Sequence, residues 1–274
     1  MKLTKTKGGS LFRKIAMGSW NTAGDPSVYG LLEIDMSNAL VFLEKLNQQS
    51  DVKIGVSELI GRATALVLRQ RPEMNGMMRL GRIYLRDSVN LFYQVNVPGG
   101  ENDPIGKANL LGLTIQNAEK KSLLEIATEL KLKAGAIKSG HENEMTKSVK
   151  TLSFVPWQLM KFVLNFTSFL NYDLNLPLRY LGMPKDPFGS VMITNVGGMG
   201  VDTAWAPLVP YTRVPLLLTI GAVKDRAWVV NGKVEARPVL RVGCTFDHRF
   251  MDGVHAAAMT RLFLNYFENP ELLL

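Results

Sequence analysis

The feature that most constrains the fold of this 274-residue chain is the alternation of amphipathic helical segments with short strand-like runs. Residues 57–70 start at a capping serine, Ser57, and repeat apolar side chains at helical spacing on one face. Residues 122–138 begin with Ser122 and Glu125, which have the spacing of a capping box. Both segments are therefore predicted to be helices that pack on a core through one face. Two further helices are predicted at about 38–47 and 254–267.

The segments between these helices have the composition of strands. Residues 82–97 fit either two strands or one long bent strand. Asn231-Gly232 lies between two apolar runs, which predicts a hairpin turn whose residues adopt positive φ. Helices and strands that interleave in this way indicate an α/β fold. Three more strands are predicted at 188–196, at 214–222 and, returning from the hairpin, at about 239–246.

The composition is that of a globular protein in a reducing compartment. Hydrophobic residues make up 46% of the chain and charged residues 20%, which allows a sizeable core. The single cysteine, Cys244, excludes an internal disulfide. Residues 1–10 are basic, with no apolar stretch behind them, so we expect a flexible basic N-terminus and no signal peptide. We therefore expect a cytoplasmic protein.

The net charge of +8 bears on the partners of the chain. Such a charge suits nucleic acid, an anionic membrane or a phosphorylated small molecule. The basic residues form no long run with interleaved aromatic side chains, and we therefore expect no nucleic-acid partner. An anionic cofactor such as coenzyme A fits the charge equally well. A solvated basic surface is the simplest alternative.

One apolar segment does not fit the alternation. Between residues 151 and 172 only Lys161 is charged, and the apolar side chains surround the predicted helix. Lys161 is central and Pro156 breaks one end, which argues against a membrane span. Three locations stay open: the protein core or a subunit interface, the wall of a substrate tunnel, or membrane contact, which is the least favoured. Leu159, Val163, Phe166 and Leu170 share one helical face.

The chain has only three histidines, and one of them lies where reactive side chains are common. His248 belongs to the string TFDHRFMDG, residues 245–253, between a predicted strand and a predicted helix. A buried histidine with satisfied hydrogen bonds is the plain structural alternative. His141, in a polar stretch, and His255 have no further metal-binding residue types at ligand spacing. Cys244 alone cannot complete the ligands of a zinc ion, so we predict no metal.

The string TFDHRFMDG resembles the DHRxxDG signature of the acyltransferase (E2) catalytic domain of 2-oxoacid dehydrogenase complexes, a relative of chloramphenicol acetyltransferase. The resemblance spans roughly residues 11–274, with a gap at about 141–187. Other stretches agree in order: Arg13-Lys-Ile-Ala16 with the opening Arg-Lys segment of the family, Asn117-Ala-Glu-Lys-Lys-Ser-Leu-Leu-Glu-Ile126 with a helix entry, Met192-Ile-Thr-Asn-Val-Gly197 with a Thr-Ile-Ser-Asn-Leu-Gly string, and Asn269-Pro-Glu-Leu-Leu-Leu274 with an apolar tail.

The resemblance implies the fold and the domain plan. It implies a chloramphenicol acetyltransferase-like fold, in which a mixed sheet is flanked by helices and three copies form a trimer. Residues 11–274 would form a single catalytic domain with an apolar insertion at about 141–187. Because the resemblance begins almost at residue 11, we expect neither a lipoyl domain nor a peripheral-subunit-binding domain in this sequence.

The resemblance also implies a coenzyme A-dependent acyl transfer between thiols. His248 would be the general base, and such help is worth roughly 10²–10⁴ in rate. Thr194 stands where the family has a serine, and its hydroxyl would donate to the oxyanion of the tetrahedral intermediate. In the family this donor comes from the neighbouring subunit, so the site would need a trimer.

Five further residues would support this site by resemblance. Asp252 would pair with Arg13 and hold the histidine loop, since a buried carboxylate requires a partner. A role for Asp252 as a second catalytic acid is the alternative. Asp247 and Arg249 would support the same loop, and Gly253 would allow the turn from strand to helix. No residues that bind coenzyme A are assigned.

The resemblance leaves the acceptor and the partners open. Acyl groups would come from acyl-CoA or from a lipoyl group on a separate carrier protein, in trans. We expect a homotrimer, with a larger cage as a further option. Two alternatives to the enzyme are kept: a non-catalytic trimeric scaffold that recruits partners, and lipid acylation at a membrane reached through residues 151–172.

Overall fold

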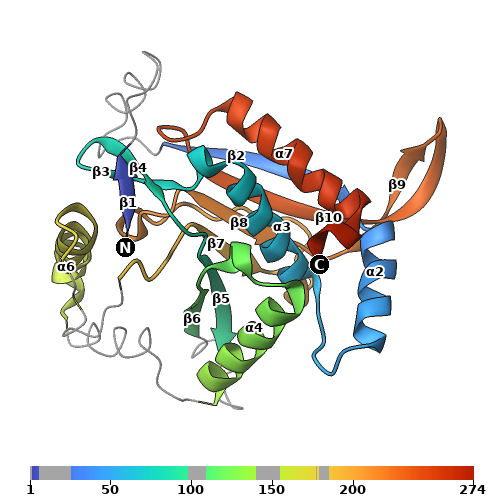
Figure 1. The fold of residues 1–274 in the computed structure, drawn as a ribbon, viewed down its shortest axis with the longest axis horizontal. Helices are drawn as coiled ribbons and strands as arrows, with labels where there is room; N and C mark the ends of the chain where they lie inside the picture. The colour runs from blue at the N-terminus through green and yellow to red at the C-terminus, as the bar shows by residue number, and fades with distance from the viewer. Residues whose placement is uncertain (1, 6–25, 98–108, 140–154, 177, 179–184) are drawn as a thin grey trace.

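The computed structural model describes residues 2–5, 26–97, 109–139, 155–176, 178 and 185–274, and Arg13 and His141 therefore lie outside the described residues. A seven-stranded mixed sheet forms the centre of the fold (Figure 1). Six strands follow the order β2-β10-β8-β7-β5-β6, with β9 paired to β10; only the β5–β7 and β7–β8 pairs are parallel. The strands are β2 (Ser27–Asp35), β5 (Leu91–Val97), β6 (Asn109–Ile115), β7 (Val191–Asn195), β8 (Leu216–Ile220), β9 (Lys224–Val230) and β10 (Lys233–Asp247).

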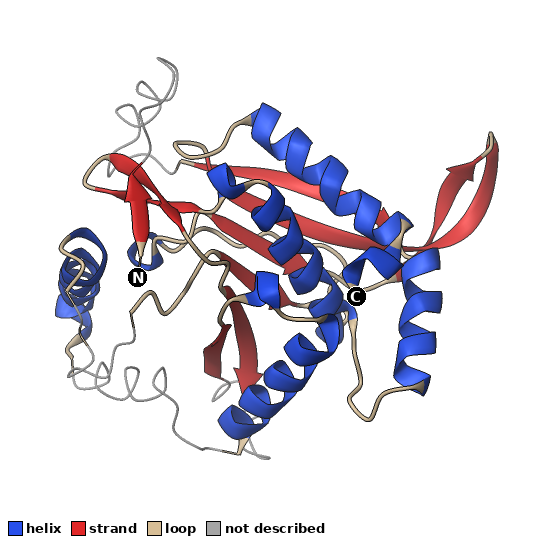
Figure 2. Ribbon diagram, viewed as in Figure 1, coloured by secondary structure: helices blue, strands red, loops and turns tan. Residues whose placement is uncertain are grey.

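Helices cover one face of this sheet, as Figures 1 and 2 show. The helices are α2 (Ser37–Gln48), α3 (Val56–Gln70), α4 (Leu123–Lys138) and α7 (Gly253–Glu268). Short 3₁₀ turns follow α3 at Pro72–Met74, precede α4 at Ala118–Lys120 and follow α7 at Pro270–Leu273. The main core lies between these helices and the sheet, and it includes Leu59, Ile60, Leu91, Ile126 and Phe267. The predicted mixed sheet flanked by helices is thus confirmed.

A second and smaller sheet has the strand order β1-β4-β3. Its strands are β1 (Leu3–Lys5), β3 (Gly76–Arg79) and β4 (Arg82–Arg86). Residues 82–97, for which two interpretations were open, therefore form two strands, β4 and β5, which belong to different sheets. The hairpin prediction is also confirmed, because Asn231 has φ 50° and Gly232 φ 77° at the turn between β9 and β10.

Of the two predicted helix caps, one is confirmed and one is wrong. Ser122 accepts a hydrogen bond from the backbone of Glu125 at 3.2 Å, and the Glu125 carboxylate accepts from the backbone of Ser122 at 2.7 Å, which is the predicted capping box. Helix α3 instead begins one residue earlier, with Gly55 as its N-cap, and the Glu58 carboxylate accepts from the Gly55 backbone at 2.9 Å. Ser57 therefore lies inside the helix.

The apolar segment forms α6 (Trp157–Ser168), followed by one π-helical turn over Phe169–Asp173. The polar end of this unit is anchored to the body: Arg213 donates to the Asp173 carboxylate at 2.7 Å and to the Ser168 hydroxyl at 3.2 Å. Leu159, Phe162 and Phe166 are 53%, 68% and 49% exposed. The core of the same chain therefore does not enclose α6, and a subunit interface stays open as its location. No helix of the described residues is long and apolar enough to cross a membrane.

Candidate active site

His248 lies directly after the last residue of β10, where the neighbouring strand still holds the backbone. The His248 N–H donates to the carbonyl of Pro26 at 2.8 Å, which extends the pairing of β10 with β2 by one residue. The Asp247 N–H donates to the carbonyl of Pro215 at 2.9 Å, just ahead of β8. Two flanking segments thus fix the backbone at the half-buried histidine.

The Met251 carbonyl determines the tautomer of His248. The Nδ1 atom of His248 lies 2.9 Å from the Met251 carbonyl oxygen. Because a carbonyl oxygen can only accept a hydrogen bond, Nδ1 must carry the proton. In the neutral ring the lone pair is then on Nε2, which is the arrangement that a general base requires. Only the folded loop brings this backbone acceptor within reach, so side-chain patterns alone did not reveal it.

Asp247 and Arg249 hold the same loop from either side of the histidine. Arg249 donates through Nε to Asp247 Oδ1 at 3.0 Å and through Nη2 to Oδ2 at 2.7 Å. The backbone N–H of Arg249 also donates to Oδ1 at 2.9 Å. Hydrogen bonding to the Asp247 carboxylate raises the pKa of the Arg249 guanidinium. The bidentate geometry makes this a rigid clamp, consistent with the predicted supporting role.

Asp252 is the N-cap of α7. Its carboxylate accepts from the backbone N–H groups of Val254 at 3.1 Å and His255 at 3.2 Å, and it contacts Nδ1 of His255. The predicted partner, Arg13, lies outside the described residues. The Asp252-x-x-His255 spacing before an apolar helix could have predicted this cap from the sequence. The histidine loop and the helix start are thus joined through consecutive residues.

Gly253 does not have a backbone conformation that requires glycine. The residue is the first of α7, its φ lies outside the left-handed region, and a Cβ atom added there would meet none of the described residues within 4 Å. The turn from strand to helix therefore requires no glycine at this position.

Thr194 lies at the end of β7, on the sheet face opposite the helices. The strand register places Thr194 level with Thr219, and Thr219 level with Gly243. His248 is five residues further along β10 and two strands away. With about 3.3 Å per residue and about 4.8 Å per strand, the two side chains are roughly 15–20 Å apart in one chain. An oxyanion donor must come to about 3 Å, so one chain does not bring them together.

Asn195 fixes the strand end that carries Thr194, a role that the sequence did not indicate. Its side-chain amide donates to the Ser57 hydroxyl of α3 at 2.8 Å. Its side-chain oxygen accepts from the backbone of Gly197 at 2.9 Å and of Gly198 at 3.3 Å. Ser57, which was predicted to cap α3, therefore ties that helix to the Thr194 strand.

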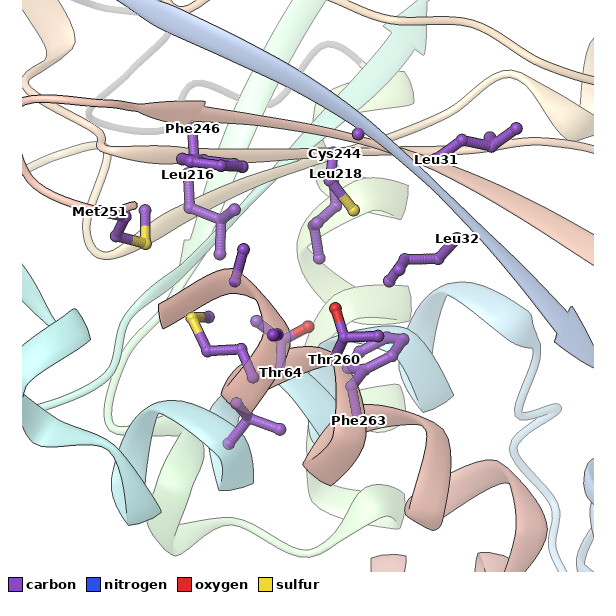
Figure 3. Close-up of a pocket in the computed structure, with 15 residues that line it drawn as sticks. Leu31, Leu32, Thr64, Leu216, Leu218, Cys244, Phe246, Met251, Thr260 and Phe263 are labelled. Atoms are coloured by element: carbon purple, nitrogen blue, oxygen red, sulfur yellow. The ribbon is translucent and has the colours of Figure 1, made fainter. Parts of the chain in front are cut away.

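An apolar cavity of about 270 Å³ lies beside the histidine loop, between the sheet and helices α3 and α7 (Figure 3). Burial raises the pKa of the Cys244 thiol, which lines it, to about 12. The Thr64 hydroxyl, also in the wall, donates to the Ile60 carbonyl within its own helix. No charged side chain is among the described residues that line the cavity. Its main apolar walls are Leu216, Leu218, Phe246, Met251 and Phe263.

The described residues contain no group of three or more His, Cys, Asp or Glu side chains that could hold a metal ion.

The chain matches the sequence profile of the family described as 2-oxoacid dehydrogenases acyltransferase (catalytic domain) over residues 14–155 and 187–274. It is 25% identical over 252 residues to the probable dihydrolipoyllysine-residue succinyltransferase component of the 2-oxoglutarate dehydrogenase complex of Schizosaccharomyces pombe, covering 88% of this chain and 44% of the relative. The corresponding Saccharomyces cerevisiae protein is 23% identical over 262 residues, with 93% and 45% covered. The chain thus spans less than half the length of these two relatives.

Solved structures show the same fold. A dihydrolipoamide acetyltransferase from Azotobacter vinelandii matches with a TM-score of 0.66 and 19% identity, over 100% of this chain and 93% of that one. The cubic core of a pyruvate dehydrogenase multienzyme complex matches at 0.65 with 19% identity, over 98% and 94%. A chloramphenicol acetyltransferase matches at 0.55 with 13% identity, over 97% and 100%. By its profile match, the chain belongs to the family of 2-oxoacid dehydrogenase acyltransferase catalytic domains.

Proposed function

We propose that the chain transfers acyl groups between the thiol of coenzyme A and that of dihydrolipoamide, with His248 as the general base. The observation that carries the proposal is the Nδ1 contact of His248 with the Met251 carbonyl, which leaves the lone pair on Nε2. The relatives named above are dihydrolipoyllysine-residue acyltransferases, which supports the same chemistry.

The reaction removes one proton from the attacking thiol and later delivers a proton to the departing sulfur. A free thiol has a pKa near 8.5 and is only a few per cent ionised at neutral pH. Nε2 of His248 takes the S–H proton as the sulfur attacks the thioester carbonyl. The C–S bond that forms gives a tetrahedral oxyanion, to which the Thr194 hydroxyl of a neighbouring copy donates. Collapse breaks the other C–S bond, and the imidazolium returns its proton to the departing sulfur.

The loop around His248 provides the support that this step requires. The Azotobacter vinelandii enzyme was studied for the role of a serine, a histidine and an asparagine in its catalytic mechanism, and that asparagine follows the histidine by four positions. Asp252 stands four positions after His248 here. We assign Asp252 a positioning role, because its carboxylate caps α7 while the preceding residue holds the imidazole.

The acceptor and the assembly are part of the proposal. The chain would work as a homotrimer, and the likeness to a cubic core supports further assembly into a cage. A lipoyl group would reach the site on a separate carrier protein, and acyl-CoA would enter as a substrate. No metal has a part in this reaction as we propose it.

The proposal is tested by measuring acyl exchange between acetyl-, succinyl- or longer acyl-CoA and dihydrolipoamide. We expect His248→Ala to lower kcat by about 10²–10⁴. His141→Ala removes another histidine and serves as the control, with activity unchanged. Circular dichroism and gel filtration establish that both variants fold and assemble alike. Equal rates for the wild type and His248→Ala would refute the enzyme and favour a non-catalytic scaffold.

A further inference from the structure

The cavity beside the histidine loop has the chemistry of a hydrocarbon site. Its walls are mostly apolar; the Thr64 hydroxyl is already bonded within α3, and Thr260 adds one further hydroxyl (Figure 3). A phosphate, a carboxylate or an amide placed there would lose most of its water and find at most this one hydroxyl as a partner. A saturated carbon chain loses nothing polar on entering and covers apolar walls that would otherwise face water.

We propose that this cavity binds the aliphatic chain of the acyl group that is transferred, and that the enzyme therefore prefers medium-chain acyl thioesters. This inference rests on the proposed function. The size of the cavity sets the length of the chain. An engineered apolar cavity of about 150 Å³ in another protein binds benzene, which has six carbons. By proportion, the roughly 270 Å³ here hold about ten carbons.

The cavity and the histidine share a wall. The Met251 carbonyl accepts from His248 Nδ1, and the side chain of Met251 lines the cavity (Figure 3). The alternation of side chains along β10 also places His248 on the cavity side of the sheet. Cys244 and Phe246 line the cavity, and His248 comes two residues after Phe246, where the backbone is still paired next to β2. A thioester carbonyl at His248 would thus have its chain directed past Met251 into the cavity.

The first test is the dependence of kcat/KM on chain length, with dihydrolipoamide as acceptor. We expect kcat/KM to rise about fourfold per methylene from acetyl-CoA to a maximum near eight to ten carbons. Ala257→Phe on α7, at the exposed rim of the cavity, should lower kcat/KM for octanoyl-CoA more than tenfold and leave acetyl-CoA within twofold. Val254→Phe adds the same ring to α7 at a position 80% exposed and outside the lining, and should match the wild type.

The second test measures occupancy without catalysis. Cys244 is the only cysteine, so alkylation by N-ethylmaleimide reports on the cavity alone. Decanoate should slow this alkylation at least tenfold in the wild type and in His248→Ala, but not in Ala257→Phe. Acetate is the control and should give no protection.

The two tests separate the failure of this inference from the failure of the proposed function. A flat chain-length profile with His248-dependent acetyl transfer, and no protection by decanoate, would overturn the cavity assignment alone. Protection by decanoate without any His248-dependent transfer would overturn the proposed function and leave a fatty-chain site. Equal loss of acetyl and octanoyl transfer in Ala257→Phe would mean damage to the histidine loop, and would also contradict the inference.

Discussion

Thr194 carries one hydroxyl and one methyl group, and the proposed mechanism uses only the hydroxyl. Thr194→Val keeps the shape and removes the donor, so we expect kcat to fall about 10²–10³ with little change in KM. Thr194→Ser restores the donor and should retain kcat within a few-fold. Steady-state kinetics at saturating acyl-CoA provides the measurement. Wild-type kcat in Thr194→Val would mean that another group stabilises the oxyanion.

The second prediction concerns the pH dependence of stability. Burial raises the pKa of the Cys244 thiol from an ordinary value of 9.0 to about 12. Since the fold favours the protonated thiol, this contribution to stability is complete below about pH 9 and is lost as the pH rises towards 12. In urea titrations the wild type should lose more stability than Cys244→Ala between pH 8 and pH 10.5. Native Cys244 should also react with N-ethylmaleimide at pH 8 more slowly than in urea, because its raised pKa leaves less thiolate. Equal rates would contradict its burial.

At the scale of single residues the sequence pointed to His248 as the candidate base, but it did not indicate which contacts hold the imidazole. The string around His248 indicated a reactive loop, and Asp247 and Arg249 do clamp it. The Met251 carbonyl could not be predicted, because a backbone acceptor has the same sequence signature everywhere. Gly253 was expected to allow the turn from strand to helix, whereas its backbone has no positive φ that would require glycine.

Asp252 joins helix α7 to the histidine loop, and its contribution to the helix can be measured as a change in stability. Asp252→Ala leaves two N–H groups of the first turn without their acceptor, and should lower the free energy of unfolding by about 1 kcal/mol. Asp252→Asn keeps a good capping residue and should lose less. Urea titrations at pH 7 provide the measurement.

Ser122→Ala, in the cap of α4, is the matched control for this prediction. It should cost about the same stability and leave kcat unchanged, because α4 does not carry the histidine loop. Asp252→Ala should lower kcat in addition, at a temperature where both variants are folded. If both variants lost stability and neither lost activity, Asp252 would have no role beyond the cap.

Elements with strong local signals were predicted well, and elements defined by their surroundings were not. The capping box at Ser122 and the Asn231-Gly232 turn depend on a few neighbouring residues, and both are confirmed. The apolar face of α6 was expected to be covered, yet Phe162 is 68% exposed in the single chain. A sequence shows that a face is apolar, but what covers it depends on contacts beyond the element.

For the whole molecule, the mixed sheet could be anticipated but its strand order could not. Neighbours β5 and β7 are separated by about a hundred residues, and such long-range pairing leaves no local trace. The strand order has a functional consequence, because it places Thr194 and His248 two strands apart and at different levels. A site that uses both must combine two copies of the chain.

Subunit mixing tests this shared site. His248→Ala and Thr194→Val each lower kcat by about a hundredfold or more in the proposed mechanism, but a mixed trimer can contain an intact histidine facing an intact threonine. If each of the three sites takes its histidine from one subunit and its threonine from the next, random 1:1 mixing makes a site intact with probability ½ × ½. About a quarter of wild-type activity should then return after joint unfolding and refolding. If both residues came from one chain, no mixture would be active, and mixtures that stay silent despite verified subunit exchange would exclude the shared site.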